Sequence, residues 1–371
     1  MHVRPLSIVH TENSAGWGGQ EIRILTEARG MLERGHRVTL LTPPETPIYD
    51  AAARYGVPAV PLGIRRKQPS DFFVLRAWLS RHRQSIDVLN THSSTDSWLG
   101  ALSCASMANP PPIVRTRHVS THINNSAATR WLYCRAAAHI VTAGEAVRHS
   151  IAETNAVPLE RITSVPTGID LHQFVPGDAV AARSRVGLPQ KPTLGIVATL
   201  RDWKGHDYLF DALALERAAW AGWNIVVVGD GPHRPKLDRR VAQLGLGDNL
   251  RFVGQQHDVV PWFQSLDLFT LPSYGEEGVP QAIMQAMACA IAVVSTPVGA
   301  IREAVDDAVT GILVEPRSAS ALSAGLARLR DDPDLRARYA LAGRARAIGF
   351  FGIDRMLDGM ESVFRYVLDR A

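Results

Sequence analysis

The chain has 371 residues, of which 46% are hydrophobic and 20% are charged, and its formal net charge is +4. This length favours two domains over a single core, and the composition excludes a disordered or fibrous chain. So small a net charge gives no support to a nucleic-acid partner. No apolar run approaches the ~18 residues that a membrane-spanning helix requires.

Three cysteines and the first residues indicate the compartment. Cys104, Cys134 and Cys289 stand apart, with no CxxC spacing. This pattern is typical of small core residues in a reducing compartment, not of disulfides or a zinc site. The apolar run near the start is too short for a signal peptide. We therefore expect a cytoplasmic protein; the alternative is a peripheral one on the inner face of the membrane.

Short β-branched runs alternate with helical patterns along the whole chain. The expected strands of the first half are 6–10, 37–41, 87–90, 112–116 and 139–143, with helices at 21–34 and 130–138 between them. Those of the second half are 193–198, 224–229, 250–254, 267–271, 291–295 and 311–314. This alternation predicts an α/β protein with two doubly wound parallel sheets, separated near 166–192. Ligands of such sheets bind beyond the carboxyl ends of the strands, so the expected site is the cleft between the domains.

Glycines and cations follow the first strand of each series. Gly18 and Gly19 precede the first helix, where backbone N–H groups can approach an anion, although a plain tight turn explains them equally well. In the second series, Arg201 and Lys204 precede Gly205. An arginine fork and a lysine point charge suit a diphosphate, and the alternative is two solvated charges on a loop.

The stretch GEEGVPQAIMQAMA follows the fourth strand of the second series. Pro280 fits the first turn of a helix, and the N–H groups around Gly278 and Val279 then face an anion. Glu277 can accept hydrogen bonds from hydroxyl groups, and Gln285, two turns further on, can bridge a second polyol group. The spacing suits a ligand with hydroxyls at both ends and phosphates between them, which is a sugar nucleotide.

Other motifs favour structural explanations. The sequence GDGP after strand 224–229 is similar to a nicotinamide-cofactor turn but lacks the third glycine, so we favour a tight loop. The aspartate pairs 306–307 and 331–332 favour solvated loops or helix ends over a metal site.

Segment 71–84, DFFVLRAWLSRHRQ, lies in a basic region in which seven cations between residues 54 and 83 are opposed by Asp71 alone. On a helix, Phe72, Leu75 and Leu79 share one face, and this face could rest on an anionic membrane surface. The alternative is a core-packed helix whose outer face is basic.

Four motifs together resemble glycosyltransferase family 4: PSYGEEGVPQAIMQAMACAIAVVSTPVGAIREAV, VPTGIDLHQF, LRDWKGH and VVGDGP. The resemblance extends over nearly the whole chain, and GGQEIRILTEARGMLERGHRVTLLTPP adds a similarity to bacterial cell-surface and lipopolysaccharide enzymes. It implies the GT-B fold, two Rossmann-like domains facing a central cleft. The expected domains are 1–170 on the acceptor side, completed by a C-terminal helix at 350–371, a linker at 171–190, and 191–349 on the donor side.

The resemblance implies a retaining glycosyltransferase without metal or cofactor. It would move a sugar from a nucleotide-sugar donor to a saccharide or lipid-linked acceptor, in lipopolysaccharide or surface polysaccharide synthesis. Three alternatives remain: a sugar-nucleotide 2-epimerase of the same architecture, a non-catalytic sugar-nucleotide-binding subunit, and a nicotinamide oxidoreductase built on GDGP.

Individual roles follow from the same resemblance. Glu277 matches a glutamate that contacts the donor sugar, and Lys204 matches the lysine that holds the diphosphate. Gly18 and Gly19 match the loop that approaches the phosphates. His118, in VRTRHVS, matches a histidine near the donor sugar, and its alternative is a surface loop histidine.

The chain departs from the family pattern at three positions. Gln285 stands where a glutamate normally binds the ribose hydroxyls. Thr199 replaces an arginine, for which Arg201 can substitute from two residues further on. Ala290 stands where glycine is usual, which questions the tightness of that turn.

Overall fold

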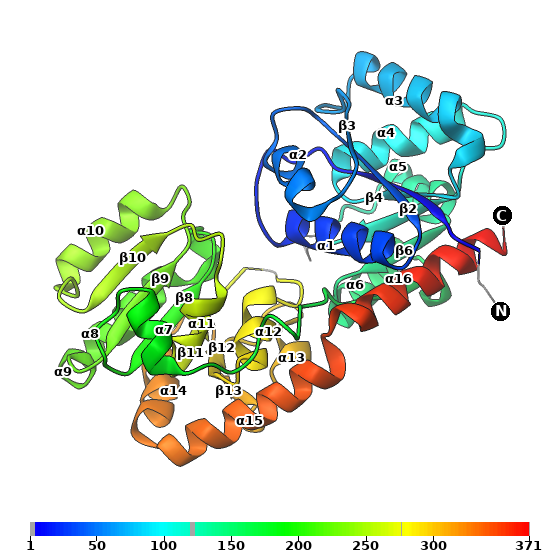
Figure 1. Cartoon of the computed structure of the whole chain (residues 1–371). Coiled ribbons are helices and arrows are strands. Elements are labelled where there is room, and N and C mark those ends of the chain that lie inside the picture. The colour runs from blue at the N-terminus through cyan, green and yellow to red at the C-terminus, as the bar shows by residue number, and fades with distance from the viewer. Residues whose placement is uncertain (1–3, 119–122, 276, 371) are drawn as a thin grey trace. The chain divides into compact units, whose positions relative to one another are not determined.

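The computed structural model describes residues 4–118, 123–275 and 277–370. The chain forms two compact units: unit 1 holds residues 1–168 and 353–371, and unit 2 holds residues 169–352 (Figure 1). Residues 171–190, predicted as a linker, lie within unit 2 and contain α7 (Ala179–Arg185). The Asp178 side chain caps this helix, and Arg183 anchors it through a 2.5 Å ion pair with Asp267.

Unit 1 contains a seven-stranded parallel sheet in the order β3-β2-β1-β4-β5-β6-β7. Its strands are β1 (Ser7–Thr11), β2 (Arg37–Thr42), β3 (Ala59–Pro61), β4 (Val88–Thr91), β5 (Ile113–Arg117), β6 (His139–Thr142) and β7 (Ile162–Ser164). Its α-helices are α1 (Gly19–Glu33), α2 (Pro47–Ala52), α3 (Pro69–His82), α4 (Ser94–Ala105), α5 (Ala127–Trp131), α6 (Glu145–Asn155) and α16 (Ile353–Leu368).

Unit 2 contains a six-stranded parallel sheet in the order β10-β9-β8-β11-β12-β13. Its strands are β8 (Thr193–Val197), β9 (Asn224–Val228), β10 (Leu250–Gly254), β11 (Leu268–Leu271), β12 (Ala292–Ser295) and β13 (Gly311–Leu313). Besides α7, its helices are α8 (His206–Leu215), α9 (Arg217–Trp220), α10 (Arg234–Leu244), α11 (Val260–Gln264), α12 (Gln281–Ala288), α13 (Ile301–Ala304), α14 (Ala319–Asp331) and α15 (Pro333–Phe350). The expected pair of Rossmann-like sheets is thus confirmed.

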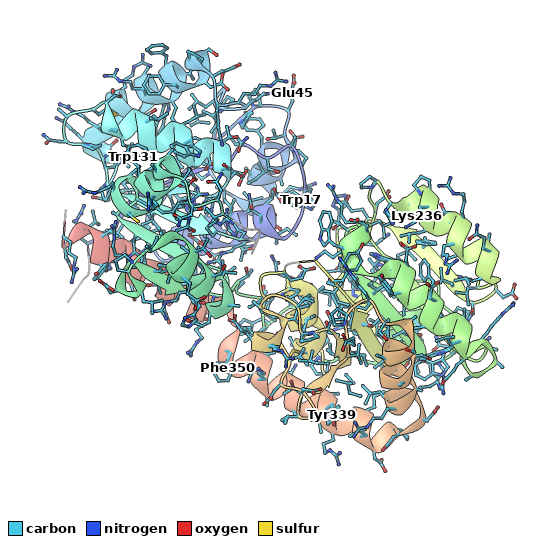
Figure 2. All side chains as sticks on the ribbon, turned by 180° about the vertical axis from the view of Figure 1, so that it is seen from behind. Trp17, Glu45, Trp131, Lys236, Tyr339 and Phe350 are labelled. Carbon is cyan, nitrogen blue, oxygen red and sulfur yellow. The ribbon has the colours of Figure 1, made fainter. Side chains whose placement is uncertain are left out.

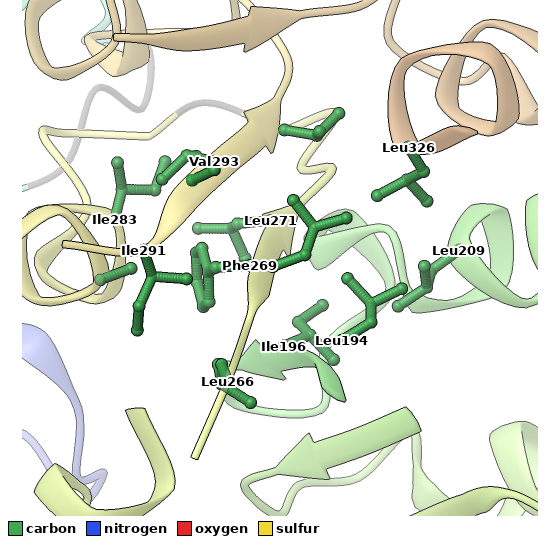
Figure 3. Close-up of a cluster of buried hydrophobic side chains, with 14 of the residues drawn as sticks. Leu194, Ile196, Leu209, Leu266, Phe269, Leu271, Ile283, Ile291, Val293 and Leu326 are labelled. Carbon is green, nitrogen blue, oxygen red and sulfur yellow. The ribbon is translucent and has the colours of Figure 1, made fainter. Parts of the chain in front are cut away.

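Each sheet has a core of β-branched and leucine side chains. In unit 2, Ile196, Phe269 and Val293 from three adjacent strands are fully buried beneath the covering helices (Figure 3). In unit 1 the apolar face of α16, with Phe364 fully buried, packs beside α1 against the sheet. Strands buried on both faces read as nearly continuous apolar runs, which explains why most of them were predictable.

The sequence analysis missed two strands and overextended one helix. The three-residue strands β3 and β7 form the two edges of the first sheet, and neither carries a long apolar run. The helix expected at 130–138 is instead α5, followed by a π-helical segment at Leu132–Ala136.

The helix at 71–84 is a core helix. Leu75 and Leu79 are fully buried, and Phe72 packs against the same cluster. Of the two environments considered for this apolar face, a membrane surface and the core, the structure shows the core of unit 1. Phe73 and Val74 are large hydrophobic side chains of α3 that stay exposed beside the cations of this region. In the described part of the chain, no helix is long and apolar enough to cross a bilayer.

Candidate functional site

The loops after β8 and β11 bring Lys204 and Glu277 into contact in unit 2. Lys204 Nζ lies 2.6 Å from Glu277 Oε1, and the Ser273 hydroxyl donates to the same oxygen at 2.8 Å. Both side chains are largely buried, with 18% and 10% of their surface exposed. β8 and β11 are neighbours at the point where the strand order reverses, which is where open α/β sheets bind their ligands.

Two glycines allow these loops to meet. Gly205 has φ +78°, and a Cβ atom there would lie 2.0 Å from the carbonyl oxygen of Pro272. Gly299, after β12, has φ +54°, and its Cβ would lie 2.1 Å from the Glu277 carbonyl oxygen. That carbonyl accepts a hydrogen bond from Ala300 N at 2.9 Å. Any residue with a side chain would be strained at both positions and would separate the loops.

Helix α12 begins at Gln281, four residues after Glu277. Pro280 is the N-cap residue of α12, whereas the sequence predicted it inside the first turn of the helix. Gly278 and Val279 precede it. The first N–H groups of the helix have no partner within the helix and carry its positive dipole end. Gln285 lies one turn inside α12 and is partly exposed, and its side chain forms no hydrogen bond within the described part of the chain.

Arg201 lies in the loop after β8, which also carries Lys204, and its side chain is exposed. Its guanidinium carbon is 5.6 Å from the ring centre of Trp203, and no hydrogen bond or ion pair of the side chain is found among the described residues. Thr199 is exposed nearby in sequence. The departure at Ala290 leaves the turn in place, because this alanine adopts φ +56°. Alanine in that conformation costs about 1 kcal/mol relative to glycine.

In unit 1 the glycines stand at the start of α1, after Trp17 (Figure 2). Gly18 is the N-cap residue, with extended backbone, and a Cβ there would meet nothing closer than 3.7 Å. The fold therefore leaves room for a side chain at Gly18. A ligand that approaches the backbone is one reason for glycine there.

His118, just after β5, is joined to two histidines that the sequence analysis missed. His10 Nδ1 lies 2.9 Å from His92 Nε2, and His92 Nδ1 lies 2.9 Å from His118 Nε2. All three stand at the carboxyl ends of the adjacent strands β1, β4 and β5. His10 ends the expected strand 6–10, and His92 closely follows the expected strand 87–90. Position at a strand end is therefore the sequence signal that marks both. Residues 119–122 lie outside the described part of the chain.

A buried acidic group lies close to this histidine chain (His10, His92 and His118). Glu12 accepts hydrogen bonds from the N–H groups of Asn13 and Ser14 and from the side chains of Gln20 and Ser93. Burial raises the pKa of Glu12 to about 8, and the charge of nearby Asp96 adds to the rise.

Asp96 holds two strand ends together. Its Oδ2 accepts from the Thr11 hydroxyl at 2.7 Å and from His92 N at 2.9 Å. Burial raises the pKa of this carboxyl to about 6, and these hydrogen bonds oppose the rise.

Two family models match the chain. Residues 191–332 match the model described as glycosyl transferases group 1, and residues 17–173 match the model described as glycosyltransferase family 4. The two matches together span about four fifths of the sequence. The chain belongs to glycosyltransferase family 4.

Individual proteins show the same relationship. A D-inositol 3-phosphate glycosyltransferase of Streptomyces scabiei is 28% identical over 396 residues, covering 94% of this chain and 86% of that protein. LpsB of Rhizobium meliloti, a lipopolysaccharide core biosynthesis mannosyltransferase, is 31% identical over 215 residues, covering 56% of this chain and 61% of that protein.

Solved structures confirm the GT-B fold. A glycosyltransferase of Rickettsia africae superposes with a TM-score of 0.89 at 18% identity, covering 100% of both chains. HepE of Anabaena, solved in complex with UDP-glucose, has a TM-score of 0.83 at 19% identity, covering 97% of this chain and 100% of that one. The protein is a nucleotide-sugar-dependent glycosyltransferase.

This family 4 enzyme uses the GDGP motif as a structural loop. A Cβ atom at Gly229 would lie 2.0 Å from the Ala198 carbonyl oxygen, and one at Gly231 would lie 2.6 Å from that of Leu200. The glycines thus let two strand-end loops pack together. Because the chain belongs to glycosyltransferase family 4, two alternatives are set aside. These are a nicotinamide oxidoreductase built on this motif and a 2-epimerase.

The aspartate pairs have structural partners. Asp307 Oδ1 accepts from Leu313 N at 2.8 Å, and Asp332 caps α15 by accepting from Leu335 N at 2.8 Å. Asp331 forms an ion pair with Arg330 at 2.7 Å. Cys104, Cys134 and Cys289 are free thiols, of which Cys104 and Cys289 are buried.

The raised pKa of Glu12 predicts a pH-dependent loss of stability. Between its ordinary pKa of 4.5 and its folded value of about 8, the folded chain keeps a proton that the unfolded chain loses. The free energy of unfolding therefore falls as the pH rises through this interval. Glu12→Gln removes the titration, so we expect its melting temperature relative to the unaltered chain to increase from pH 5 to pH 8. The corresponding gain in the free energy of unfolding, relative to the unaltered chain, is on the order of a few kcal/mol.

Differential scanning fluorimetry at both pH values measures this difference. Glu153→Gln, at an exposed position of α6, is the control and should leave the pH dependence unchanged. A difference between the Glu12→Gln variant and the unaltered chain that is the same at pH 5 and pH 8 would contradict a raised Glu12 pKa.

Proposed function

We propose that this glycosyltransferase retains anomeric configuration and transfers a sugar to a saccharide or lipid-linked acceptor of a bacterial surface polysaccharide such as lipopolysaccharide. The observation that carries the proposal is the Lys204–Glu277 pair at the reversal point of the second sheet. A cation and a hydroxyl-accepting carboxylate, side by side, suit the two chemical parts of a nucleotide sugar. Lys204 binds the diphosphate, and Glu277 binds the sugar hydroxyls.

The donor can bind without breaking this pair. A lysine ammonium has three N–H donors, and Lys204 directs one of them at Glu277. The remaining donors, the Arg201 guanidinium and the N–H groups at Gly278 and Val279 can meet phosphate oxygens. These groups supply the positive charge that the leaving diphosphate needs, and we propose that transfer requires no metal or other cofactor.

In the proposed reaction the bond between the anomeric carbon and the diphosphate oxygen breaks. The acceptor hydroxyl forms the new bond on the same face of the sugar and passes its proton to the departing diphosphate oxygen. The products are a nucleoside diphosphate and the glycosylated acceptor. The protein stabilises the negative charge that grows on the diphosphate and holds the reactants in place.

Two observations support the donor and the pathway. HepE of Anabaena, which shares the fold, was solved with UDP-glucose, and LpsB of Rhizobium meliloti acts in lipopolysaccharide core biosynthesis by its name. For the acceptor side, α3 retains the exposed Phe73, Val74 and Arg81, and Arg66 and Lys67 precede it. We propose that this basic edge of unit 1, and not the buried face of α3, meets an anionic membrane surface on the cytoplasmic side.

Lys204→Ala should reduce transfer on the order of 10²-fold, because it removes a charge that stabilises the leaving diphosphate. The measurement is release of nucleoside diphosphate from a nucleotide-sugar donor with an acceptor present. Lys191→Ala, at an exposed position of unit 2, is the matched control and should keep full activity. Near-normal turnover by a folded Lys204→Ala protein would contradict the assignment. If the unaltered chain bound the donor and transferred nothing, the protein would be a non-catalytic binding subunit.

Gln285→Ala should weaken donor binding about tenfold, because one amide group that can both donate to and accept from ribose hydroxyls is lost. Thermal shift as a function of nucleotide-sugar concentration measures the affinity, since a ligand at 100 times its dissociation constant stabilises by about 2.7 kcal/mol. Gln264→Ala, in α11, removes an amide that donates to the Val175 carbonyl oxygen at 3.0 Å and so controls for general loss of stability. Unchanged donor affinity in Gln285→Ala would show that the ribose is held elsewhere.

A further inference from the structure

The histidine chain of unit 1 has a built-in direction. Its two hydrogen bonds, each 2.9 Å long, join Nδ1 of His10 to Nε2 of His92 and Nδ1 of His92 to Nε2 of His118. The planes of the first two rings differ by 8° and those of the second two by 30°. Near-coplanar rings are compatible with an N–H···N bond between imidazoles, because the N–H and the acceptor lone pair each lie in their own ring plane.

All three rings are neutral. Burial lowers the pKa of His10 to about 3. Burial, followed by nearby positive charges that include Arg23 and Arg115, holds the pKa values of His92 and His118 well below their ordinary range. A neutral imidazole carries a single N–H, so each ring donates once and accepts once.

Only two hydrogen arrangements then satisfy both bonds. In the first, every ring is protonated at Nδ1, and the bonds run from His10 toward His118. In the second, every ring is protonated at Nε2, and the bonds run toward His10. The histidine chain cannot combine one bond from each arrangement, because the neutral His92 ring would then need two N–H groups or none.

The buried end of the chain decides between the two arrangements. His10 Nε2 is fully buried and has no hydrogen-bond partner among the described residues. The second arrangement would place an N–H there, and buried N–H groups without an acceptor are the rarer and costlier kind of unsatisfied group. The first arrangement leaves an unprotonated nitrogen at that position and places an N–H at Nδ1 of His118, and His118 as a residue is partly exposed.

We propose that His10 and His92 are positioning residues that hold His118 as its Nδ1–H tautomer. His118 then donates a hydrogen bond to an oxygen of a ligand bound at the carboxyl ends of β1, β4 and β5, and it does not serve as a base. Asp96 fixes the geometry, because its carboxylate binds Thr11 and the backbone of His92, next to the ends of β1 and β4. The ligand part of this inference rests on the proposed function, whereas the tautomer does not.

Nitrogen-15 NMR of the full chain, labelled at histidine, measures the tautomer directly. The His118 signals are assigned by their absence from the His118→Gln spectrum. The inference predicts an Nδ1–H and an unprotonated Nε2 for His118, both at neutral pH and without ligand. An Nε2–H tautomer, or a protonated ring, would overturn it. This result is independent of what the enzyme transfers, so a chain without transferase activity would contradict the proposed function alone.

Two nearly isosteric variants test the role of His10. In His10→Asn the side-chain amide can still donate to His92 Nε2, so His118 should keep the Nδ1–H tautomer. In His10→Asp an ionised carboxylate only accepts, so the chain should reverse and present an unprotonated Nδ1 at His118. Retention of the Nδ1–H tautomer at His118 in His10→Asp would overturn the positioning role. If that variant does not fold, the spectrum of the unaltered chain still decides the tautomer.

Discussion

The carboxyl ends of parallel strands lie along one edge of a sheet, and both functional regions of this protein depend on that constraint. In unit 2 it brings the loops after β8, β11 and β12 together. Gly205 and Gly299 then let the loop backbones touch, because a Cβ at either position would overlap a carbonyl oxygen. The Lys204–Glu277 ion pair is a consequence of these backbone contacts. Its two charges are largely removed from water, so each needs the other and the Ser273 hydroxyl.

The same constraint produces the polar interior of unit 1. His10, His92 and His118 stand at the ends of three adjacent strands, with Glu12 and Asp96 close by. Burying so many ionisable groups costs stability, as the raised pKa of both carboxyls shows. A fold under no functional demand would place apolar side chains there. We interpret the arrangement as stability given up for a rigid, neutral hydrogen-bond donor beside a ligand.

The sequence predicted the two sheets well because most strands are buried on both faces and appear as apolar runs. It missed β3 and β7, whose three residues at the sheet edges leave no such signal. It could not decide whether the apolar face of α3 meets a membrane or the core, since both explain Leu75 and Leu79 equally well. Residue types alone cannot separate the two environments.

The sequence predicted which residues belong to the candidate site but not which of them contact each other. Strand-end position and residue type singled out Lys204 and Glu277 separately, and the resemblance supplied their roles. Their pairing follows from the approach of Gly205 to the Pro272 carbonyl, which no sequence spacing shows. The histidine chain depends on which strands are neighbours, and strand order is a property of the fold.

The most direct test of this account is a crystal structure of the chain with an intact nucleotide-sugar donor. The account predicts that diphosphate oxygens lie within hydrogen-bonding distance of Lys204 Nζ and of the N–H groups at the start of α12, with a sugar hydroxyl on Glu277. A donor bound away from the ends of β8 and β11, with Lys204 and Glu277 contacting only each other, would contradict it.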